Sequence, residues 1–341
     1  MLIIVDGSSL LHQAVNIKNS KGSLGILQDK TFGAYWFLNS LSNLASKNRH
    51  WCSFVIAWDS GIPLHRRKLS KEYKPHKKFV EESGVDFSEY YSSENLQEPQ
   101  EGMELFLERY NYSKDLLHKI LPYTGCLSIK VPNCEADDIV AVFVNKLKDN
   151  QDEIIILSSD RDLDQLLEDN VFRYDAVKKQ NIYKTDVIEK HDLIEKNWKR
   201  HWLYNKALLG DTSDNIKGFY GMGEKAAQYY SRQIVEKGLA DFTKLEPSSK
   251  FPNALQSLVS DQKRFWNNCK MMDLKYIISM KEPLYQKINE EVCSCGIYEP
   301  DLYNANQILC QESLQTALSS AQNIYDSNQN NPPKEFIKLF L

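Results

Sequence analysis

The stretch Glu135-Ala136-Asp137-Asp138-Ile139-Val140-Ala141-Val142-Phe143-Val144 puts three acids in front of a strongly apolar run. A helix of this composition is predicted to lie in the protein interior. The helix dipole stabilises an acid near the N-terminus by roughly 0.3–1 kcal/mol, whereas two carboxylates about 4 Å apart repel by about 4 kcal/mol at an effective dielectric near 20. Two interpretations stay open: the acids point into water as an ordinary helix start, or a cation lies among them.

Acids also follow three short apolar runs that are predicted to be buried strands. The runs and the acids after them are residues 2–5 with Asp6, residues 53–58 with Asp59, and residues 154–157 with Asp160 and Asp162. Helical patterns separate the strands, which favours an α/β fold with a mainly parallel sheet. Such sheets carry their chemistry at the carboxyl ends of the strands. The aromatic side chains of the predicted helix 31–46 either fill the core or stack on bases.

A fourth acidic place lies further along the chain. Asp211 and Asp214 are three positions apart, so both can face one cation. Gly221 and Gly223 then precede a predicted helix, where backbone amides can approach an anion, and Lys225 adds positive charge there. The same pattern also occurs in helix–turn–helix connections that bind nothing.

Charge is distributed unevenly over residues 65–108. The basic part contains Arg66, Arg67, Lys68, Lys71, Lys74, Lys77 and Lys78 against the single acid Glu72. Residues 79–108 then contain nine acids and no basic residue. We expect the basic run to contact phosphates and the acidic stretch to be an insertion that competes with nucleic acid for it.

The composition is that of an ordinary globular protein of 341 residues with a formal net charge of −4. This charge excludes a uniformly basic coat but not a local basic face. No apolar run approaches the roughly 18 residues of a membrane span, and the N-terminus lacks the basic leader of a signal peptide. Seven cysteines without framework spacing indicate reduced thiols in a cytoplasm. Cys293 and Cys295 are a single pair, too few ligands for zinc.

Together the acids predict a metal site. If the four places converge, nine carboxylates share one pocket: Asp6, Asp59, Glu135, Asp137, Asp138, Asp160, Asp162, Asp211 and Asp214. Their mutual repulsion predicts that convergence requires divalent cations. Oxygen ligands without histidine or cysteine favour Mg²⁺, with Mn²⁺ as a substitute, over zinc. Two such ions suit phosphodiester hydrolysis, because one acidifies the attacking water and the other stabilises the leaving oxygen.

The ordered set of motifs resembles the flap endonuclease family of structure-specific 5′ nucleases. Within it, the set is most similar to the bacteriophage 5′→3′ exonuclease/RNase H enzymes and to the 5′-nuclease domain of bacterial DNA polymerase I. The matching motifs are Val5-Asp6-Gly7, Trp58-Asp59, Arg66 to Lys78 with Tyr73-Lys74, Glu135-Ala136-Asp137-Asp138, Ser159-Asp160-Arg161-Asp162, Gly210-Asp211 with Asp214-Asn215-Ile216, and Gly221-x-Gly223-x-Lys225-Ala226. They occur in family order across residues 1–240, and the order is what makes the resemblance specific.

The resemblance implies a PIN-like α/β nuclease domain followed by an α-helical domain with a helix–three-turn–helix element. Asp6, Asp59, Glu135, Asp137 and Asp138 would serve the first Mg²⁺ ion, and Asp160, Asp162, Asp211 and Asp214 the second. Arg66 and Lys74 would neutralise the scissile phosphate, and Arg67, Lys71, Tyr73, Lys77 and Lys78 would bind nucleic acid beside them. Gly221, Gly223 and Lys225 would hold the duplex backbone, with a K⁺ ion on the loop carbonyls.

The expected domain organisation follows the same order. We place the nuclease domain at 1–192 with an arch region at 62–108, the helical DNA-binding domain at 193–325 with its helix–three-turn–helix at 207–237, and a linker and tail at 326–341. Helices are predicted over 262–272 and 301–321, and a polar linker over 326–333. The apolar tail either folds back onto the body or docks on a sliding clamp or a single-strand binding protein.

The function implied is Mg²⁺-dependent hydrolysis of phosphodiesters near the 5′ ends of branched, nicked or RNA–DNA duplexes by a monomer, in the host cytoplasm if the chain is phage-encoded. Two alternatives are a PIN-domain ribonuclease that acts on single strands and a non-catalytic DNA-binding relative. The predicted duplex-binding element at 210–227 argues against the first alternative. The complete set of nine acids argues against the second.

Overall fold

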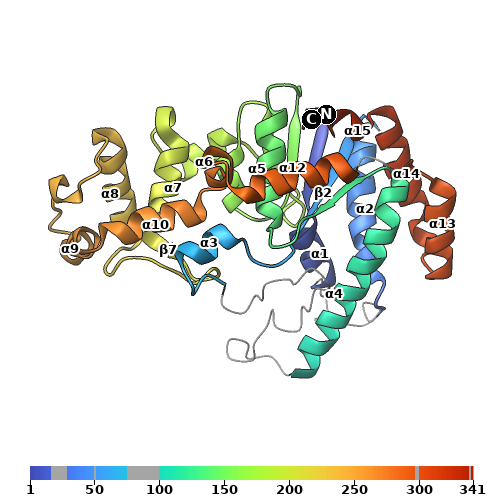
Figure 1. Cartoon of the computed structure of the whole chain (residues 1–341), viewed down its shortest axis with the longest axis horizontal. Helices are drawn as coiled ribbons and strands as arrows, with labels where there is room; N and C mark the ends of the chain where they lie inside the picture. Colours follow the sequence, from blue (N-terminus) through green and yellow to red (C-terminus); the bar gives the residue numbers. More distant parts are fainter. Residues whose placement is uncertain (17–28, 50, 75–99, 296–298, 338, 341) are drawn as a thin grey trace.

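The buried strands form one six-stranded sheet in the computed structural model, which describes residues 1–16, 29–49, 51–74, 100–295, 299–337 and 339–340 (Figure 1). The strand order is β3-β2-β1-β4-β5-β6. The strands are β1 (Leu2–Asp6), β2 (Ser53–Trp58), β3 (Leu127–Lys130), β4 (Ile154–Leu157), β5 (Val171–Asp175) and β6 (Gln180–Ile182). Neighbours pair in parallel except in the antiparallel β5–β6 hairpin. The predicted α/β fold with a mainly parallel sheet is confirmed.

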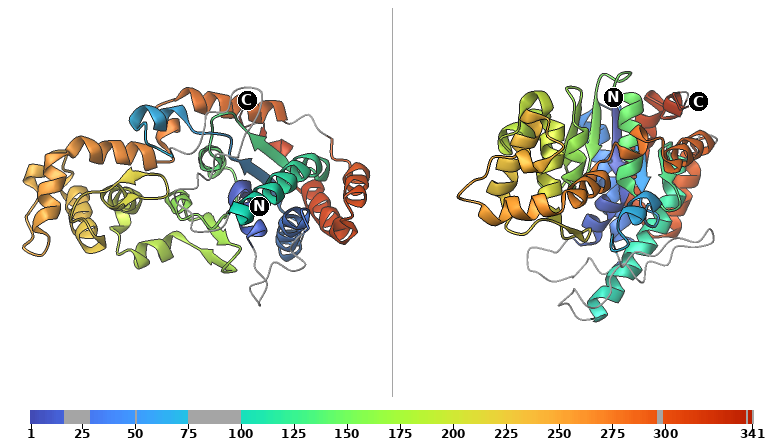
Figure 2. Two further views of the ribbon diagram at one scale, coloured as in Figure 1. Left: turned by 90° about the horizontal axis from the view of Figure 1, so that it is seen from below. Right: turned by 60° about the vertical axis from the view of Figure 1, so that its left-hand side comes forward.

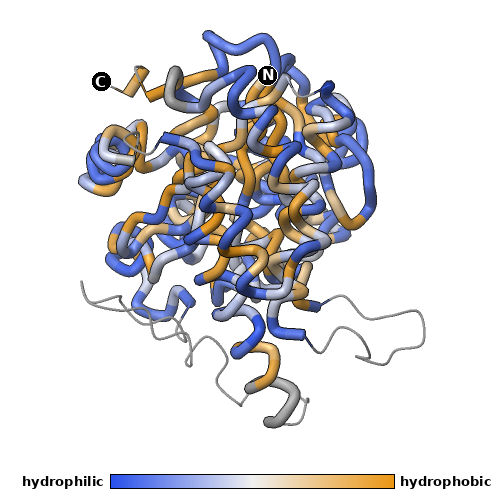
Figure 3. The backbone as a smooth tube through the Cα atoms, turned by 90° about the vertical axis from the view of Figure 1, so that its right-hand side faces the viewer, coloured by the Kyte–Doolittle hydropathy of each residue, from blue (hydrophilic) through white to orange (hydrophobic). Residues whose placement is uncertain are grey.

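Helices cover both faces of this sheet (Figure 1). One face carries α1 (Gly7–Val15), α2 (Phe32–Lys47), α4 (Gln100–Ile120), α13 (Leu302–Gln311) and α14 (Leu318–Asn330), and the other carries α5 (Ala136–Leu147), α12 (Pro283–Cys295) and α15 (Lys334–Ile337). Ile3 and Val5 of β1 belong to the first core, and Leu2 and Ile4 to the second. Because both faces are covered, the strands are continuous apolar runs, and hydrophobic segments run through the middle of the body (Figure 3).

A third apolar core lies at one end of the molecule and is mainly helical (Figures 1 and 2). It is built from α7 (Trp198–Leu209), α8 (Glu224–Lys237), α9 (Pro252–Ser260) and α10 (Gln262–Met272), next to α3 (Leu64–Leu69). The two-residue strands β7 (Gly210–Asp211) and β8 (Ile216–Lys217) pair in the connection from α7 to α8. The helix predicted over 262–272 is therefore confirmed. A small apolar cluster that includes Val187 and Trp198 spans the boundary predicted at residue 192, and the division into domains stays a prediction.

Two sequence predictions for the C-terminal region are wrong. The helix predicted over 301–321 is broken after Gln311, where Ser313 adopts a left-handed backbone. The linker predicted over 326–333 instead continues α14 as far as Asn330. Its polar side chains satisfy backbone groups near β2: Ser327 Oγ donates to the Cys52 carbonyl at 2.6 Å, and Asn328 Oδ1 accepts from the Phe54 N–H at 3.0 Å. Polarity therefore reflected internal hydrogen bonds rather than solvation.

The apolar tail packs on the body. Phe336, Ile337 and Phe340 are each less than one-tenth exposed, and the Phe340 ring centre lies 4.8 Å from that of Phe143 in α5. The folded-back alternative is the one found. None of the described helices is long and apolar enough to cross a membrane.

Candidate functional site

The ends of β1 and β2 bring the first two acids to one edge of the sheet. Asp6 is the last residue of β1 and lies opposite Ala57, two residues before Asp59. The Asp6 carboxylate caps α1 by accepting the Ser9 N–H at 3.0 Å, and it accepts the Ser158 hydroxyl at 2.9 Å. Burial, followed by the nearby charge of Asp59, raises the pKa of Asp6 to about 7. A cation at this position would remove that penalty.

The acidic start of α5 joins this edge. Asp59 Oδ1 accepts the Ala136 N–H at 2.8 Å, which fixes the first turn of α5 against the end of β2. Burial raises the pKa of Asp137 well above its usual range, and the charges of Asp160, Asp6 and Asp59 raise it further. These four side chains, Asp6, Asp59, Asp137 and Asp160, which we call the strand-end acids, thus lie close enough for their charges to interact. No basic side chain in the described ranges forms an ion pair with Asp6, Asp137 or Asp160.

The other two acids of the helix start have a built-in cation. Arg66, on α3, is 3% exposed and makes two hydrogen bonds to the Asp138 carboxylate, at 2.8 and 2.9 Å. It also donates to Glu135 at 2.6 Å and, through Nε, to the Met271 carbonyl at 2.9 Å. Asp138 is fully buried. Arg66 therefore joins α3 to α5 through a bidentate ion pair with Asp138, and it joins α3 to the end of α10 through its hydrogen bond to the Met271 carbonyl.

Lys74 and Tyr73 connect Glu135 to the acids near α7. The Lys74 ammonium pairs with Glu135 and, at 3.1 Å, with Asp214. The Tyr73 hydroxyl lies within hydrogen-bond distance of the same two carboxylates, 2.9 Å from Glu135 and 3.2 Å from Asp214. Lys74 has a left-handed backbone, and its N–H donates to the Asp214 carbonyl at 3.2 Å. The segment before residue 75 is thus fixed to the loop after α7.

Lys206 of α7 neutralises the remaining pair. Its ammonium binds Asp162 and, at 3.2 Å, Asp211. Burial alone would raise the pKa of Asp211, but hydrogen bonds from Ser213 and the charge of Lys206 outweigh it and hold the pKa below its usual value. We call Glu135, Asp138, Asp162, Asp211 and Asp214 the paired acids.

These contacts correct the roles expected for two basic-run residues. Arg66 and Tyr73 are 3% and 2% exposed and are bonded to carboxylates, so neither presents its side chain to a nucleic acid. Arg67 is half-buried and donates to the carbonyls of Lys71 and Lys74, whereas Lys71 is exposed. Lys77 and Lys78, and residues 79–99 of the acidic stretch, lie outside the described residues.

The loop between α7 and α8 has the features expected of a backbone-binding turn. Gly221 has φ +73°, and a Cβ there would lie 3.1 Å from Asn253 Cβ. Gly223 is the N-cap of α8, open space surrounds it, and Lys225 is exposed in the first turn. The tightest approach is at Gly210, where a Cβ would lie 2.3 Å from the backbone nitrogen of Gly218.

Several residues of the site had no recognisable sequence signal. Lys206 lies on α7 as one basic residue among several, and only its spacing of five from Asp211 could have indicated the pair. Lys114 of α4 is buried and donates to the Asp59 carbonyl at 3.3 Å. Ser158 donates to Asp6 and accepts the Asp160 N–H at 3.0 Å. Ser158 thus helps to orient Asp6 and Asp160. The sequence indicates this role only because Ser158 lies two residues before Asp160.

The donor set suits a hard divalent cation. All nine acids offer carboxylate oxygens, which are the ligands of Mg²⁺ and Mn²⁺. Within the described ranges, no three histidine, cysteine or acidic side chains are arranged closely enough to hold a metal ion as they stand, so binding an ion requires the carboxylates to move together. The raised pKa values of Asp6 and Asp137 show where negative charge accumulates without a protein cation. A parallel sheet with such acids at its carboxyl edge defines a class of metal-dependent hydrolases.

Comparison with known proteins identifies the family. The model of the family described as "5'-3' exonuclease, N-terminal resolvase-like domain" matches residues 1–193. A 5'-3' exonuclease of Buchnera aphidicola (subsp. Acyrthosiphon pisum) is 26% identical over 309 residues, which cover 87% of this chain and 94% of the relative. The flap endonuclease of Escherichia phage T5 is 25% identical over 273 residues, covering 80% of this chain and 83% of the relative.

Solved structures agree on the fold. A phage T5 protein co-crystallised with metal ions superposes with a TM-score of 0.60 at 22% identity, covering 95% of this chain and 99% of the other. The T5 flap endonuclease in a pseudo-enzyme–product complex with DNA and metal ions gives 0.62, covering 92% and 99%. The chain belongs to the 5′–3′ exonuclease family and is a nuclease of the exonuclease and flap endonuclease type.

Proposed function

We propose that this nuclease is a Mg²⁺-dependent, structure-specific 5′ nuclease that cleaves phosphodiesters near the 5′ ends of branched, nicked or RNA–DNA duplexes. The observation that carries the proposal is the group of acids at the carboxyl edge of the sheet, where Asp6 and Asp137 have raised pKa values and form no ion pair with a basic side chain of the described residues. When bound there, divalent cations supply charge neutralisation and a more acidic water.

We assign the residues different tasks. Asp6, Asp59, Asp137 and Asp160 hold the first cation, since the mutual repulsion of their carboxylates is the largest unmet electrostatic penalty of the site. Asp162, Asp211 and Asp214 hold a second, with Glu135 between the two groups. Asp138 and Arg66 are positioning residues, because their buried ion pair fixes the start of α5 against α3. Lys74 and Lys206 have side chains that are 21% and 22% exposed beside these acids, and we assign them to meet a phosphate.

The helical end supplies the duplex contact. Gly223 and Lys225 at the start of α8 offer free backbone N–H groups and a cation to a phosphodiester backbone. Gly221 turns the loop so that its carbonyls can hold a K⁺ ion. Lys71, Lys77 and Lys78 add positive charge on the side of the basic run. DNA and metal ions occur together in the complex of the T5 relative.

The burial of the tail on the body argues against the expected protein partner. A sliding clamp or a single-strand binding protein would have to remove Phe336, Ile337 and Phe340 from the body before binding them. We propose that the tail stabilises α5 and that the enzyme works as a monomer without a tail-bound partner. Deletion of residues 334–341 should then lower the thermal stability and leave any stimulation by a clamp unchanged.

The test is a digest of 5′-labelled flap, nicked, RNA–DNA and single-stranded RNA substrates with Mg²⁺, Mn²⁺ or EDTA. We expect short products from the first three, dependence on Mg²⁺, and ends with 5′-phosphate and 3′-hydroxyl groups. Preference for free single-stranded RNA would support the PIN-domain ribonuclease instead. Binding without cleavage under every condition would support a non-catalytic relative.

A further inference from the structure

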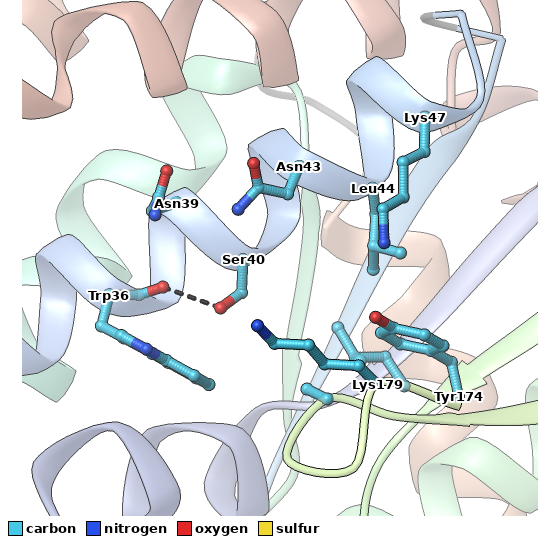
Figure 4. A pocket seen from close by; sticks show the side chains of 10 residues that line it. Trp36, Asn39, Ser40, Asn43, Leu44, Lys47, Tyr174 and Lys179 are labelled. Carbon is cyan, nitrogen blue, oxygen red and sulfur yellow. Dashed lines mark hydrogen bonds between the residues drawn. The ribbon is translucent and has the colours of Figure 1, made fainter. Parts of the chain in front are cut away.

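A cavity of about 400 Å³ lies between α2 and the β5–β6 hairpin (Figure 4). One of its walls is Leu157, the last residue of β4, and Asp160 follows three residues later. Three residues span at most roughly 11 Å, so the wall formed by Leu157 lies near the carboxyl edge of the sheet, where Asp160 follows β4. None of the residues assigned above to cleavage or to duplex binding lines it.

The lining carries two positive charges and no carboxylate. Lys179 comes from the turn of the hairpin, where its left-handed backbone (φ +54°) helps to turn the chain, and its side chain extends toward Ser40 and Trp36 of α2 (Figure 4). Lys47, at the end of α2, lies over the Tyr174 ring with its ammonium 5.5 Å from the ring centre. Both lysines are exposed and take part in no ion pair that the described residues form. The cavity therefore favours an anion.

The remaining walls suit a flat aromatic ligand. The Trp36 indole is half-buried and forms one side of the cavity, while Ser40 is held by a 2.9 Å hydrogen bond to the Trp36 carbonyl (Figure 4). Asn39 and Asn43 also line it, and neither amide has a hydrogen-bond partner among the described residues. Amides provide the donors and acceptors that read a base edge, and an indole provides a stacking surface.

We propose that this cavity binds one unpaired nucleotide of the substrate, with its base against Trp36 and its phosphate between Lys47 and Lys179. The proposal rests on the proposed function, because it adds a subsite to the same cleavage reaction. A bare phosphate would leave the indole and the amides unused, and a duplex presents no free base face to Trp36.

The test measures binding and base stacking without cleavage, in Ca²⁺ in place of Mg²⁺. Flap duplexes carry 2-aminopurine at each unpaired position in turn, and its fluorescence reports stacking. We expect quenching at one position in the wild-type protein, loss of the quenching in Trp36→Ala, and its return in Trp36→Phe. Stacking contributions of about 1–3 kcal/mol per base correspond to an about 5- to 140-fold weaker affinity of Trp36→Ala for the flap.

Lys179→Ala should weaken binding and lower the slope of log affinity against log salt by about one, as expected for one lost phosphate contact. The matched controls are Trp51→Ala, an exposed tryptophan outside the cavity, and Lys178→Ala, whose side chain pairs with Asp175 in the same hairpin. Cavity variants that bind flap substrates as tightly as these controls would overturn the proposal.

Two further outcomes separate the possible sources of failure. Competition of the strand by free dAMP at millimolar concentration would assign the cavity to a mononucleotide and overturn the strand assignment, whereas no competition supports it. A wild-type protein that cleaves no 5′ substrate would refute the proposed function. Normal cleavage together with unchanged quenching in Trp36→Ala would refute only the cavity.

Discussion

Asp137 and Asp138 are neighbours in the first turn of α5, yet their surroundings are opposite. Asp138 is fully buried and held by two hydrogen bonds from Arg66. Asp137 faces Asp160, Asp6 and Asp59, and burial and these charges raise its pKa. We propose that the protein partly neutralises the paired acids with its own cations, whereas Asp6, Asp137 and Asp160 depend more strongly on an ion from solution. On this proposal both groups hold a metal ion, and the strand-end acids bind the tighter one.

Replacing a strand-end acid should have the largest effect on catalysis. We expect Asp137→Asn to lower single-turnover cleavage of a 5′-flap substrate by about 10²–10³-fold, because a lost metal ligand removes several kcal/mol of stabilisation of the transition state. In EDTA the same variant should unfold at a higher temperature than the wild type, because one repelling charge is gone. A variant that cleaves at the normal rate would show that Asp137 does not hold the cation.

Breaking a built-in pair should act on stability instead. Arg66→Met leaves the buried Asp138 carboxylate without its cation, and such losses amount to about 3–5 kcal/mol. Urea unfolding should show this loss both with and without Mg²⁺. Arg67→Met, which removes a half-buried arginine that donates to the carbonyls of Lys71 and Lys74, is the matched control. Equal stability of the two variants would contradict a positioning role for Arg66.

Lys74 joins the two regions, so its removal should have an intermediate effect. Lys74→Ala separates Glu135 from Asp214 and misplaces both, and we expect turnover at saturating flap substrate to fall by about 10- to 100-fold. The exposed Lys71→Ala should change affinity only. If Lys74→Ala changed affinity but not turnover, Lys74 would be a docking contact rather than part of the cleavage site.

The smallest expected effect is on the pH dependence of thermal stability. Burial and Asp59 raise the pKa of Asp6 to about 7, so between about pH 4 and 7 the folded protein binds more protons than the unfolded chain. Stability in EDTA should therefore fall as the pH rises through this window, by a few degrees in the midpoint of unfolding.

Mg²⁺ competes with those protons, so its stabilising effect should be larger at pH 8 than at pH 5.5. The same scans with Asp6→Asn provide the control, and this variant should lose part of the pH dependence in EDTA, while Asp137, whose pKa is also raised, should keep the rest. A midpoint that rises with pH in EDTA would contradict the assignment.

The sequence predicted the frame of the site well. Acids after apolar runs, as at Asp6 and Asp59, locate the carboxyl edge of a parallel sheet, because strand runs and their order are local signals. The sequence could not predict which of the acids would form ion pairs with basic side chains of the protein itself. Mutual repulsion of the nine acids predicted divalent cations for all of them, but Arg66, Lys74 and Lys206 neutralise some of these acids, partly through contacts between residues far apart in sequence such as Arg66 and Asp138.

The basic run shows the same limit. Its composition predicts a solvated, phosphate-binding face. Two of its residues instead point inward, because Tyr73 bonds to Glu135, 62 positions away, and Arg66 bonds to Asp138, 72 positions away. The same holds for Ser327 and Asn328, which looked like linker residues and instead bond to buried backbone groups near β2. Polar and charged residues are assigned correctly from sequence only when their partners are local.

Mn²⁺ titration of the wild type, Asp137→Asn and Asp138→Asn, followed by electron paramagnetic resonance at a temperature where all three are folded, tests the division of the acids most directly. We predict that Asp137→Asn weakens the tightest Mn²⁺ site by at least about tenfold, equivalent to 1.4 kcal/mol, and that Asp138→Asn retains it. Unchanged Mn²⁺ affinity in Asp137→Asn, or an equal loss in Asp138→Asn, would contradict the claim that the strand-end acids bind the ion.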